Sequence, residues 1–542
     1  MMPSTETENE NTSFFSATLG VMRKIGVLDP RALYHLYRAN RNHGSSSIAG
    51  FAAAARLRPN QVGVIDERRQ YTYKQIYERS LSIANGLRDL GIQEGSQVGV
   101  LIRNHAGFIE AMNAVGALGA NVCLLNTGFA GPQLRDVVER EKITALIFDE
   151  EFEEVVEAAP GSCLRIYAWQ DKDSSGTHLA ALANHYAPQP VPKPTRPGSA
   201  TILTSGTTGT PKGARRSSPT SDAKSAVGIL EKLPLHIGQR TLVSAPMFHS
   251  WGFAQLMMGS ILGHCFILQR RFEPEKALSA LDQHRAELFA VVPVMLQRIL
   301  SLDSDVLNRF ETGCLRGTLS SGSALPGELA LRWMDQFGDN LYNFYGSTEA
   351  AQTSIAIPAD LRAAPGTAGR VPRGTTVRIL DDQGQPVARG EVGRIFVGNE
   401  SQFEGYTGGG GKEIADGLMS IGDLGWFDAE GRLFVGGRDD DMIVSGGENV
   451  FPREVEDLLS DRADVHEAAV IGVPDDDFGQ RLRGFVVMKA GEVFDENELK
   501  TFIRDRLARH KVPREIIHSS ELPRNPTGKV LKRVLREWTS PE

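Results

Sequence analysis

The feature that most constrains this chain is a hydroxyl-rich loop directly after a short apolar segment. Residues 204–213 have the sequence Thr-Ser-Gly-Thr-Thr-Gly-Thr-Pro-Lys-Gly, and residues 200–203 before them predict a buried strand. Glycine lets a backbone approach an anion closely, while hydroxyl and ammonium groups donate hydrogen bonds to phosphate oxygens. The groups concerned are Thr204, Ser205, Gly206, Thr207, Thr208, Gly209 and Lys212. The segment therefore predicts a strand followed by a polyphosphate-binding loop.

This loop is not the P-loop of ordinary nucleoside triphosphatases. That motif needs Gly-Lys-Ser/Thr at the start of a helix, whereas here Pro211 precedes Lys212 and Gly213 follows it. The order of residues therefore argues against a P-loop motor or kinase. A polar surface turn is the structural alternative for any Ser/Thr/Gly run, and the motifs described below argue against it.

Size and charge narrow the class of protein. The chain has 542 residues, enough for several domains, and its net charge of −8 argues against a general nucleic-acid binder. Its four cysteines form no Cys-x-x-Cys pair, so neither a disulfide framework nor a structural zinc site is expected. The start is polar and acidic, unlike a signal peptide, and no uncharged apolar stretch reaches the ~20 residues of a bilayer span. We expect a cytoplasmic enzyme.

The order of sequence patterns predicts three parts of the chain, 1–48, 49–437 and 438–542. The first dozen residues are expected to be disordered, and Asp29 followed by Pro30 predicts a helix through Tyr37. From about residue 60 to 300, short apolar strands alternate with amphipathic helices, as in α/β folds with mostly parallel sheets. Residues 365–437 predict a small antiparallel barrel or sheet, and the remainder predicts a compact α+β unit.

Four further stretches carry chemically informative residues. Residues 343–349 are Asn-Phe-Tyr-Gly-Ser-Thr-Glu, residues 420–423 are Ser-Ile-Gly-Asp, and Arg438 follows a glycine at the predicted boundary. Residues 525–529, Asn-Pro-Thr-Gly-Lys, place a lysine where a C-terminal helix is predicted to begin. Together with the phosphate loop, in this order and at these separations, they closely resemble the acyl-adenylate-forming superfamily. That superfamily includes acyl-CoA synthetases, firefly luciferase and the adenylation domains of peptide synthetases, and the resemblance runs from about residue 50 to residue 535.

The resemblance implies a fold and a two-step reaction. It implies a large N-terminal domain, with two α/β sheet subdomains and a small β-barrel, followed by a smaller, mobile α+β domain. Family enzymes join a carboxylate to the α-phosphate of ATP and release pyrophosphate; a thiol then attacks the mixed anhydride and releases AMP. Because the first step opposes two anions, it needs cations and oriented donors. ATP, Mg²⁺ and CoA are the expected cofactors.

The resemblance also assigns roles to individual residues. Thr204 and Glu349 would hold Mg²⁺, and Lys529 would reach the carboxylate and the α-phosphate during adenylation, so that these three residues and Lys212 form the predicted catalytic set. The predicted nucleotide wall is Gly322, Ser323, Ala324, Asn343, Tyr345, Gly346, Ser347 and Thr348, with Tyr345 on the adenine, and Asp423 and Arg438 on the ribose hydroxyls. Turn, linker or surface roles are the structural alternatives for Glu349, Asp423, Arg438 and Lys529.

Two more regions follow from the same resemblance. Asp440 would be the hinge on which the C-terminal domain turns, and Ser445, Gly446 and Gly447 would line the channel for CoA. His249, Trp251 and Phe253 are expected to line the acyl pocket, where His249 has either a chemical or a packing role. Amino-acid-activating relatives usually have an aspartate at the position of His249, after the phenylalanine. Its absence here favours an uncharged, apolar acid.

The leading prediction is an ATP-dependent CoA ligase for a medium- or long-chain fatty acid. The alternatives are an aryl- or other carboxylic-acid CoA ligase, a luciferase-like oxygenase, a fatty acyl-AMP ligase, and a catalytically silent binding protein on the same scaffold. The expected partners are a fatty acid or related apolar carboxylate, ATP and CoA, with no nucleic acid. A homodimer and peripheral contact with the inner membrane surface through residues 14–41 are open hypotheses, although Asp29-Pro30 interrupts that segment and favours packing on the main domain.

Overall fold

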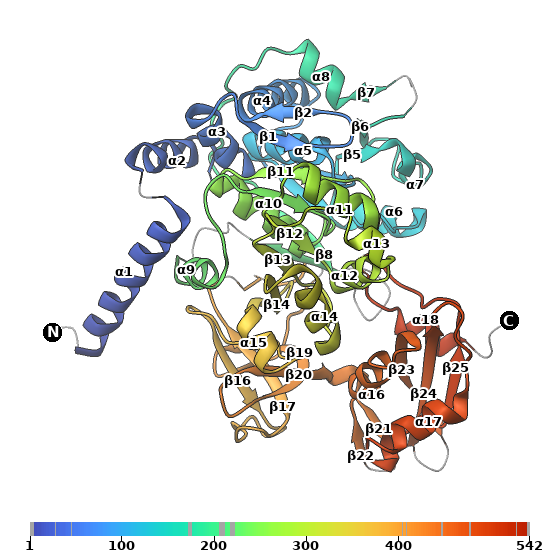
Figure 1. Cartoon of the computed structure of the whole chain (residues 1–542). Helices are drawn as coiled ribbons and strands as arrows, with labels where there is room; N and C mark the ends of the chain where they lie inside the picture. The colour runs from blue at the N-terminus through green and yellow to red at the C-terminus, as the bar shows by residue number, and fades with distance from the viewer. Residues whose placement is uncertain are drawn as a thin grey trace.

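The protein has a large upper body of two sheets with helices, a small sheet below it, and a separate C-terminal unit beside the small sheet (Figure 1). The computed structural model describes residues 5–27, 29–44, 46–171, 176–204, 212–216, 223–400, 402–403, 405–407, 409–445, 448–475, 479–526 and 528–538. Within these ranges, the α/β body, the antiparallel small sheet and the α+β C-terminal unit confirm the predicted fold class.

The first sheet carries the phosphate-loop segment at one edge. Its order is β7-β6-β5-β3-β4-β8-β9, and every neighbouring pair is parallel except β8 with β9. The strands are β3 (Gln97–Leu101), β4 (Asn121–Leu124), β5 (Ala145–Asp149), β6 (Leu164–Trp169), β7 (Thr177–His178), β8 (Ala200–Thr204) and β9 (Lys212–Arg216), and the associated helices are α4 (Tyr73–Asp89), α5 (Ala106–Ala117), α6 (Gly131–Arg140), α7 (Glu153–Val156) and α8 (Leu179–His185). All five residues of β5 are buried, as expected for a parallel strand covered on both faces.

The second sheet supplies most of the predicted nucleotide wall. Its order is β15-β14-β13-β12-β10-β11-β1-β2, parallel except at the two outer pairs. The strands are β1 (Val62–Ile65), β2 (Gln70–Thr72), β10 (Arg240–Val243), β11 (Cys265–Leu268), β12 (Leu288–Val291), β13 (Gly317–Ser320), β14 (Leu341–Ser347) and β15 (Ala351–Ala356), and the helices are α3 (Ser47–Leu57), α9 (Ala223–Lys232), α10 (Ser250–Leu262), α11 (Pro274–Gln283), α12 (Pro293–Leu300), α13 (Ser304–Leu307), α14 (Gly327–Phe337) and α15 (Pro358–Ala363). One buried cluster contains Val98 of the first sheet, Phe266 of the second and Phe108 of α5, so the two sheets share a core.

The small sheet is antiparallel, as the loss of helical periodicity predicts. Its strands are β16 (Thr376–Leu380), β17 (Gly393–Gly398), β18 (Ile414–Ala415), β19 (Leu418–Phe427) and β20 (Leu433–Arg438), in the order β16-β17-β19-β18 with β20 also on β19. Its link to the body is a short segment in which Gly369 accepts a backbone hydrogen bond from Leu433 at 2.7 Å, while Ile355 and Arg370 exchange two at 3.0 Å. This link fixes the small sheet against β15.

The C-terminal unit has its own sheet and its own core. The strands are β21 (Ile443–Ser445), β22 (Glu448–Val450), β23 (Val465–Asp475), β24 (Gly479–Met488) and β25 (Glu515–His518), and the helices are α16 (Pro452–Ser460), α17 (Glu496–Arg504) and α18 (Lys532–Glu537). Val455, Val470 and Ile503 are fully buried in this core. The predicted boundary at residue 438 stays a prediction; β20 ends there, and a 3-10 turn (Asp439–Asp441) follows.

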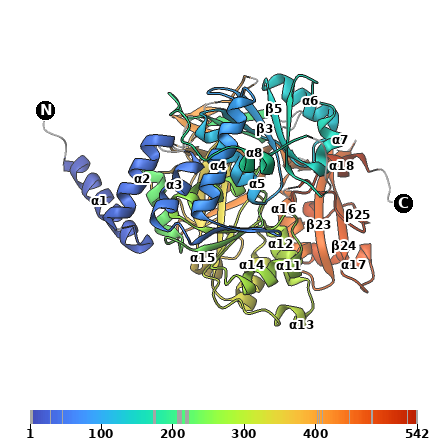
Figure 2. The same ribbon diagram turned by 90° about the horizontal axis from the view of Figure 1, so that it is seen from above.

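The N-terminal segment differs from its prediction. Helix α1 (Thr5–Ile25) includes residues for which disorder was expected, and α2 (Pro30–His43) runs six residues beyond Tyr37. The polar first residues gave no sign of α1, because the residues that hold this helix in place come later in it. Val21 and Ile25 are buried in one cluster with Val227 of α9. Asp29 caps α2 as expected, accepting a hydrogen bond from the Arg31 amide at 2.9 Å. Figure 2 shows α1 and α2 together on one flank. None of the described helices has the length and apolar character needed to cross a membrane.

We predict that Gly369→Ala weakens the junction between the small sheet and the body. Gly369 has φ +88°, and an added Cβ would lie 2.1 Å from the Ala356 nitrogen. Strain and collision should lower the free energy of unfolding by about 2 kcal/mol or more, measurable as a fall in melting temperature. The matched control is Gly384→Ala: Gly384 has φ +75° with no atom within 4 Å of the added Cβ, so it should lose only about 1 kcal/mol. If both variants lost the same free energy of unfolding, the close approach of residue 369 to Ala356 would not contribute to the stability of the junction.

Candidate active site

A single cleft brings the separate sequence motifs together. It has a volume of about 2430 Å³ and lies where the body, the small sheet and the C-terminal unit meet. The predicted site residues that line it are His249, Trp251, Phe253, Gly322, Ser323, Ala324, Asn343, Tyr345, Gly346, Ser347, Thr348, Glu349, Asp423, Arg438 and Lys529. They come from segments up to 280 residues apart, so the cleft exists only in the folded chain.

Part of the predicted site lies outside the described residues. This holds for Ser205, Gly206, Thr207, Thr208 and Gly209 of the phosphate loop, and for Gly446 and Gly447 of the predicted CoA channel. The backbone on either side of the loop is described: Thr204 ends β8, Lys212 begins β9, and the two residues pair across the antiparallel ladder. Ser445 ends β21, and Asp440 lies in the turn after β20. The roles of all these residues stay predictions.

Asp423, Arg438 and Tyr345 form a polar cluster at the edge of the small sheet. Asp423 and Arg438 are directly opposite each other on β19 and β20, and Arg438 Nη1 lies 3.5 Å from Asp423 Oδ1. The Tyr345 hydroxyl, from β14, donates a hydrogen bond to Asp423 Oδ2 at 2.5 Å. Burial raises the pKa of both Asp423 and Tyr345, while Arg438 and Lys529 act in the opposite direction on Asp423. The cluster offers a carboxylate acceptor beside a guanidinium donor, which suits a vicinal diol such as ribose.

Lys529 enters the cleft on a tight turn, not on a helix. Its amide donates to Asn525 Oδ1 and its carbonyl accepts from the Asn525 amide, both at 2.9 Å. The helix predicted to begin here begins instead at Lys532, because the backbones of Arg524 and Val530 pair with each other and hold Asn525 and Lys529 outside a helix. A side chain at Gly528 would lie 2.5 Å from Val294 Cγ1, so glycine allows this turn to approach α12.

The surroundings of Lys529 combine an open cleft with walls of protein. Its side chain is exposed within the cleft, yet the surrounding protein lowers the pKa of its ammonium group. Asp423 and Glu349 act in the opposite direction, and Arg438 reinforces the lowering. A cation held close to two carboxylates and a guanidinium is placed to meet the negative charges of two reacting anions.

Glu349 is held by a residue that sequence reasoning missed. The Tyr406 hydroxyl donates a hydrogen bond to Glu349 Oε1 at 2.7 Å. Tyr406 also pairs with Ala214 of β9, and the Thr407 amide donates to the Gly213 carbonyl at 2.9 Å. The strand that follows the phosphate loop is thereby tied to Glu349. Tyr406 had no local signal, because its partners lie far away in the chain.

The site suits Mg²⁺ and an adenine nucleotide by separate criteria. Mg²⁺ usually takes one or two carboxylates and completes its shell with phosphates and water. Glu349 provides such a carboxylate, and the described residues contain no cluster of three or more metal-binding side chains that would form a closed cage. The buried Asn343 Oδ1 has no hydrogen-bond partner in the described part of the chain, so it suits an N–H donor such as the amino group of a base.

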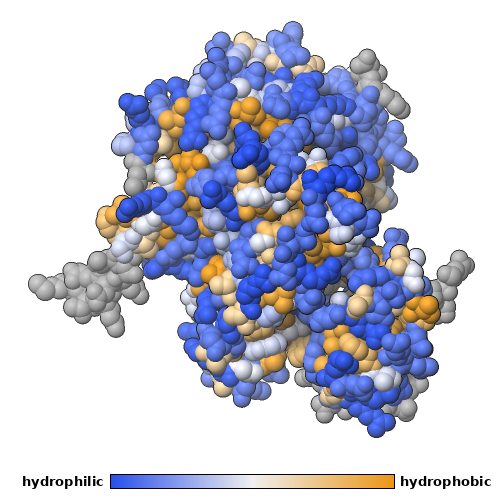
Figure 3. Space-filling view, in the orientation of Figure 1, coloured by the Kyte–Doolittle hydropathy of each residue, from blue (hydrophilic) through white to orange (hydrophobic). Residues whose placement is uncertain are grey.

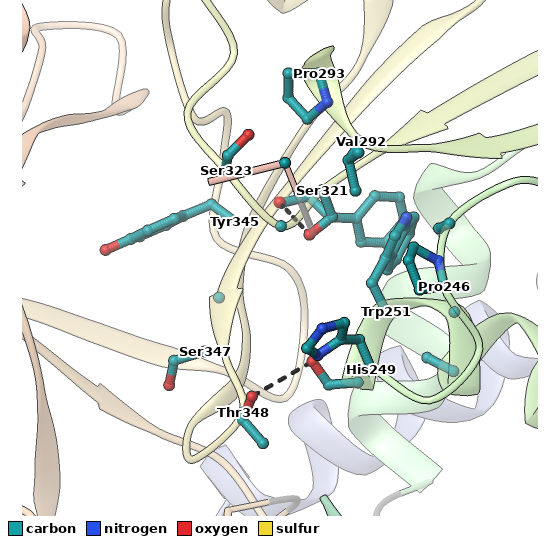
Figure 4. Close-up of a pocket in the computed structure, with 18 of the residues that line it drawn as sticks. Pro246, His249, Trp251, Val292, Pro293, Ser321, Ser323, Tyr345, Ser347 and Thr348 are labelled. Atoms are coloured by element: carbon teal, nitrogen blue, oxygen red, sulfur yellow. Dashed lines mark hydrogen bonds between the residues drawn. The ribbon is translucent and has the colours of Figure 1, made fainter. Parts of the chain in front are cut away.

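The opposite end of the site has aromatic and neutral walls. Figure 4 shows His249 and Trp251 on one side of the cavity, with Tyr345 pointing away from them. The Trp251 ring lies 4.7 Å from the Phe344 ring, and its Nε1 donates to the Val291 carbonyl at 3.1 Å. Burial, and next the charge of Lys529, lower the pKa of His249 to about 3, so its ring is neutral near pH 7. Its Nε2 is buried without a partner among the described residues.

Comparison with known proteins agrees with this geometry. The model of AMP-binding enzymes matches residues 51–407, and that of the AMP-binding enzyme C-terminal domain matches residues 454–529. The protein therefore belongs to the AMP-binding enzymes, the adenylate-forming superfamily that the motifs indicated. Adenylate-forming CoA ligases use ATP, CoA and Mg²⁺, in agreement with the predicted cofactors.

Individual relatives show which members of the superfamily the chain resembles. A feruloyl-CoA synthase from an Amycolatopsis species is 33% identical over 488 residues, covering 89% of this chain and 96% of that protein. A 2-succinylbenzoate–CoA ligase from Geobacillus kaustophilus is 33% identical over 484 residues, covering 89% and 95%. The o-succinylbenzoate CoA synthetase of Bacillus subtilis, solved with its acyl-adenylate intermediate, has a TM-score of 0.78 at 26% identity, covering 91% and 99%. These relatives favour the aryl-acid alternative over the predicted fatty-acid ligase.

We predict that Tyr406→Phe weakens Mg²⁺ use. Losing the hydrogen bond to Glu349 should raise the Mg²⁺ concentration for half-maximal ATP–pyrophosphate exchange about tenfold, since a bond to a charged group contributes roughly 1.5–3 kcal/mol. The control is Tyr77→Phe, which removes a hydroxyl 3.3 Å from His43 Nε2; neither of these two residues lines the cleft. An unchanged Mg²⁺ requirement in Tyr406→Phe would disprove the positioning role.

We predict an alkaline decline in adenylation that begins below the ordinary lysine pKa of 10.5. The lowered pKa of Lys529 means that the ammonium group loses its proton earlier than a free lysine as pH rises. The measurement is kcat/KM for ATP against pH, which reports on the free enzyme. Lys529→Arg, whose guanidinium stays charged, should retain less activity but lack this decline. The same decline in both proteins would assign it to another group.

Proposed function

We propose that this protein is an AMP-forming CoA ligase for aromatic carboxylic acids. The observation that carries the proposal is the junction of two different walls in one cleft: Asp423, Arg438 and Lys529 on the nucleotide side, and the neutral His249 beside Trp251 on the acid side. The feruloyl, 2-succinylbenzoate and indoleacetate relatives, each named for an acid with an aromatic ring, support this choice.

The walls of the acid pocket fit such a substrate. Trp251 and Phe344 present aromatic surface, on which a ring packs in an offset or edge-to-face arrangement. The unpartnered Nε2 of His249 is able to hydrogen-bond one polar substituent of the acid. Since His249 is neutral and stands where amino-acid-activating relatives usually have a carboxylate, the pocket has no counter-charge there for a substrate ammonium group.

In the first step, a carboxylate oxygen of the acid attacks the α-phosphorus of ATP. An oxygen–phosphorus bond forms, the bond from that phosphorus to the bridging oxygen breaks, and pyrophosphate leaves. Lys529 stabilises the two anions as they approach, and Asp423 with Arg438 orients the ribose, which fixes the α-phosphate. Bound Mg²⁺ would neutralise phosphate charge. Glu349, oriented by Tyr406, is the residue that would hold it.

In the second step, the thiol sulfur of CoA attacks the acyl carbon of the adenylate. A carbon–sulfur bond forms, the thiol proton passes to water, the carbon–oxygen bond to the phosphate breaks, and AMP leaves with that oxygen. We infer that Lys529 withdraws before this step, with the C-terminal unit turning at Asp440 and residues 445–447 forming the thiol channel. The single turn between β20 and β21 is a suitable position for such a hinge.

Substrate class is tested by ATP–pyrophosphate exchange with one acid at a time. The panel is acetate, benzoate, cinnamate, octanoate, palmitate and several amino acids. We expect the highest kcat/KM with benzoate or cinnamate, and thioester formation when CoA is added. A preference for octanoate or palmitate would favour the fatty-acid ligase instead. If no acid supported exchange, the proposal that the protein is an adenylate-forming enzyme would be wrong.

We predict that Lys529→Ala separates the two half-reactions. Removing the ammonium group should reduce adenylation about 100-fold or more, the usual cost of losing a group that stabilises charge in the transition state. Thioester formation from supplied acyl-AMP should change far less. The control is Lys532→Ala, which removes a nearby lysine whose Nζ lies 2.8 Å from Glu456. Equal losses in both half-reactions would contradict the two-position account of Lys529.

A further inference from the structure

The helices α1 and α2 carry an unusual concentration of exposed apolar side chains. Of the eleven large hydrophobic residues that are exposed in the described part of the chain, five lie on these two helices. They are Phe15, Leu19, Leu33, Tyr34 and Tyr37, and the three aromatic ones are 72%, 56% and 65% exposed. The space-filling view shows apolar surface on this flank of the molecule (Figure 3). Such a concentration on one flank indicates a binding surface.

The exposed residues are not needed to hold the helices in place. The opposite side of α1 buries Val21 and Ile25 in a cluster with α9, and the opposite side of α2 buries Ala39 against α3. On α2, Leu33, Tyr34 and Tyr37 are spaced so that they share one face. The packing on the main domain that the sequence predicted is therefore present, and it leaves a second, outward apolar face.

The charges of the segment that carries this face are almost all positive. Between residues 14 and 43 the chain has five lysines and arginines and a single carboxylate, although the whole protein has a net charge of −8. One of the five, Lys24, is turned toward α9, where its ammonium group donates to the carbonyls of Leu230, Glu231 and Leu233. That carboxylate, Asp29, is used as the cap of α2. Arg31, Arg38 and Arg41 are exposed on α2 beside the tyrosines.

We propose that the α1–α2 flank, defined by Phe15, Leu19, Leu33, Tyr34, Tyr37 and the arginines of α2, docks on an anionic lipid surface. Tyrosine prefers the boundary between lipid headgroups and acyl chains, and arginines on the same helix attract anionic headgroups. A second copy of the chain fits less well, because a two-fold contact would place this cationic patch against itself.

The position of the flank suits the reaction. Leu33 and Tyr37 line the same cavity as Trp251, so a docked flank borders the cavity in which the acid would bind. The C-terminal unit lies on the other side of the molecule, away from this flank (Figure 1). Docking itself does not depend on which acid is activated.

Co-sedimentation of the full chain with vesicles tests the proposal. We expect binding to vesicles of phosphatidylcholine with phosphatidylglycerol, little binding to phosphatidylcholine alone, and release when salt shortens the Debye length from about 10 Å to about 3 Å. Arg38→Glu/Arg41→Glu should weaken binding at least about fivefold for each charge removed. Phe15→Ser/Tyr34→Ser should also weaken it, with most of the salt dependence retained.

Two controls keep the result decisive. Arg504→Glu/Arg509→Glu makes the same charge change on the exposed surface of the C-terminal unit and should bind like the parent. Circular dichroism and melting temperature confirm that each variant is folded, and ATP–pyrophosphate exchange should be unchanged in Arg38→Glu/Arg41→Glu. Equal binding by all variants, or equal binding to neutral vesicles, would overturn the proposal. So would a dimer in solution that Phe15→Ser/Tyr34→Ser converts to a monomer, which would assign the flank to a second copy.

Discussion

The site depends on the contacts of the Asp423 carboxylate. It accepts a hydrogen bond from the phenol of Tyr345 and lies beside the guanidinium group of Arg438. Tyr345 belongs to the second sheet of the body, whereas Asp423 and Arg438 belong to the small sheet, so the hydrogen bond from Tyr345 to Asp423 joins two subdomains at the cleft. The link through Gly369 fixes the same two parts from behind. With both contacts in place, the small sheet presents its polar edge to the cleft wall at which Lys529 arrives from the C-terminal unit.

Opposite charges in this cleft favour the ionised forms of one another. Protein around the cleft favours the neutral forms of Asp423 and Lys529, and each group counteracts that effect in the other. An anionic substrate adds negative charge near Lys529 and favours its protonated form further. On the aromatic side of the cleft, burial and the charge of Lys529 lower the pKa of His249, so its neutral ring adds no positive charge beside Trp251. The cleft thus separates a charged half from an aromatic half.

The local pattern of apolar and polar residues was sufficient to predict much of the fold. The buried run of β5 and the antiparallel strands around residues 376–438 have periodicities that tertiary contacts reinforce. The pattern did not predict elements whose structure depends on tertiary contacts. Helix α1 is anchored by Val21 and Ile25, which lie beyond its polar start. Lys529 is held in a turn by the pairing of Arg524 with Val530. Among the residues that line the cleft, those in contiguous motifs could be named from the sequence. Tyr406 could not, because only the fold brings it to Glu349. The relatives favour the aryl-acid alternative over the predicted fatty acid, and apolar residues in sequence do not distinguish an aromatic ring from an acyl chain.

The central claim is that an acid oxygen attacks the α-phosphorus of ATP in this cleft. It is tested most directly with the most reactive acid, labelled with ¹⁸O in both carboxylate oxygens, together with ATP and CoA. Mass spectrometry of the products should find one ¹⁸O in AMP and none in pyrophosphate, because thioester formation breaks the bond between the acyl carbon and the transferred oxygen. Label in pyrophosphate or inorganic phosphate, or unlabelled AMP beside labelled thioester, would contradict the account.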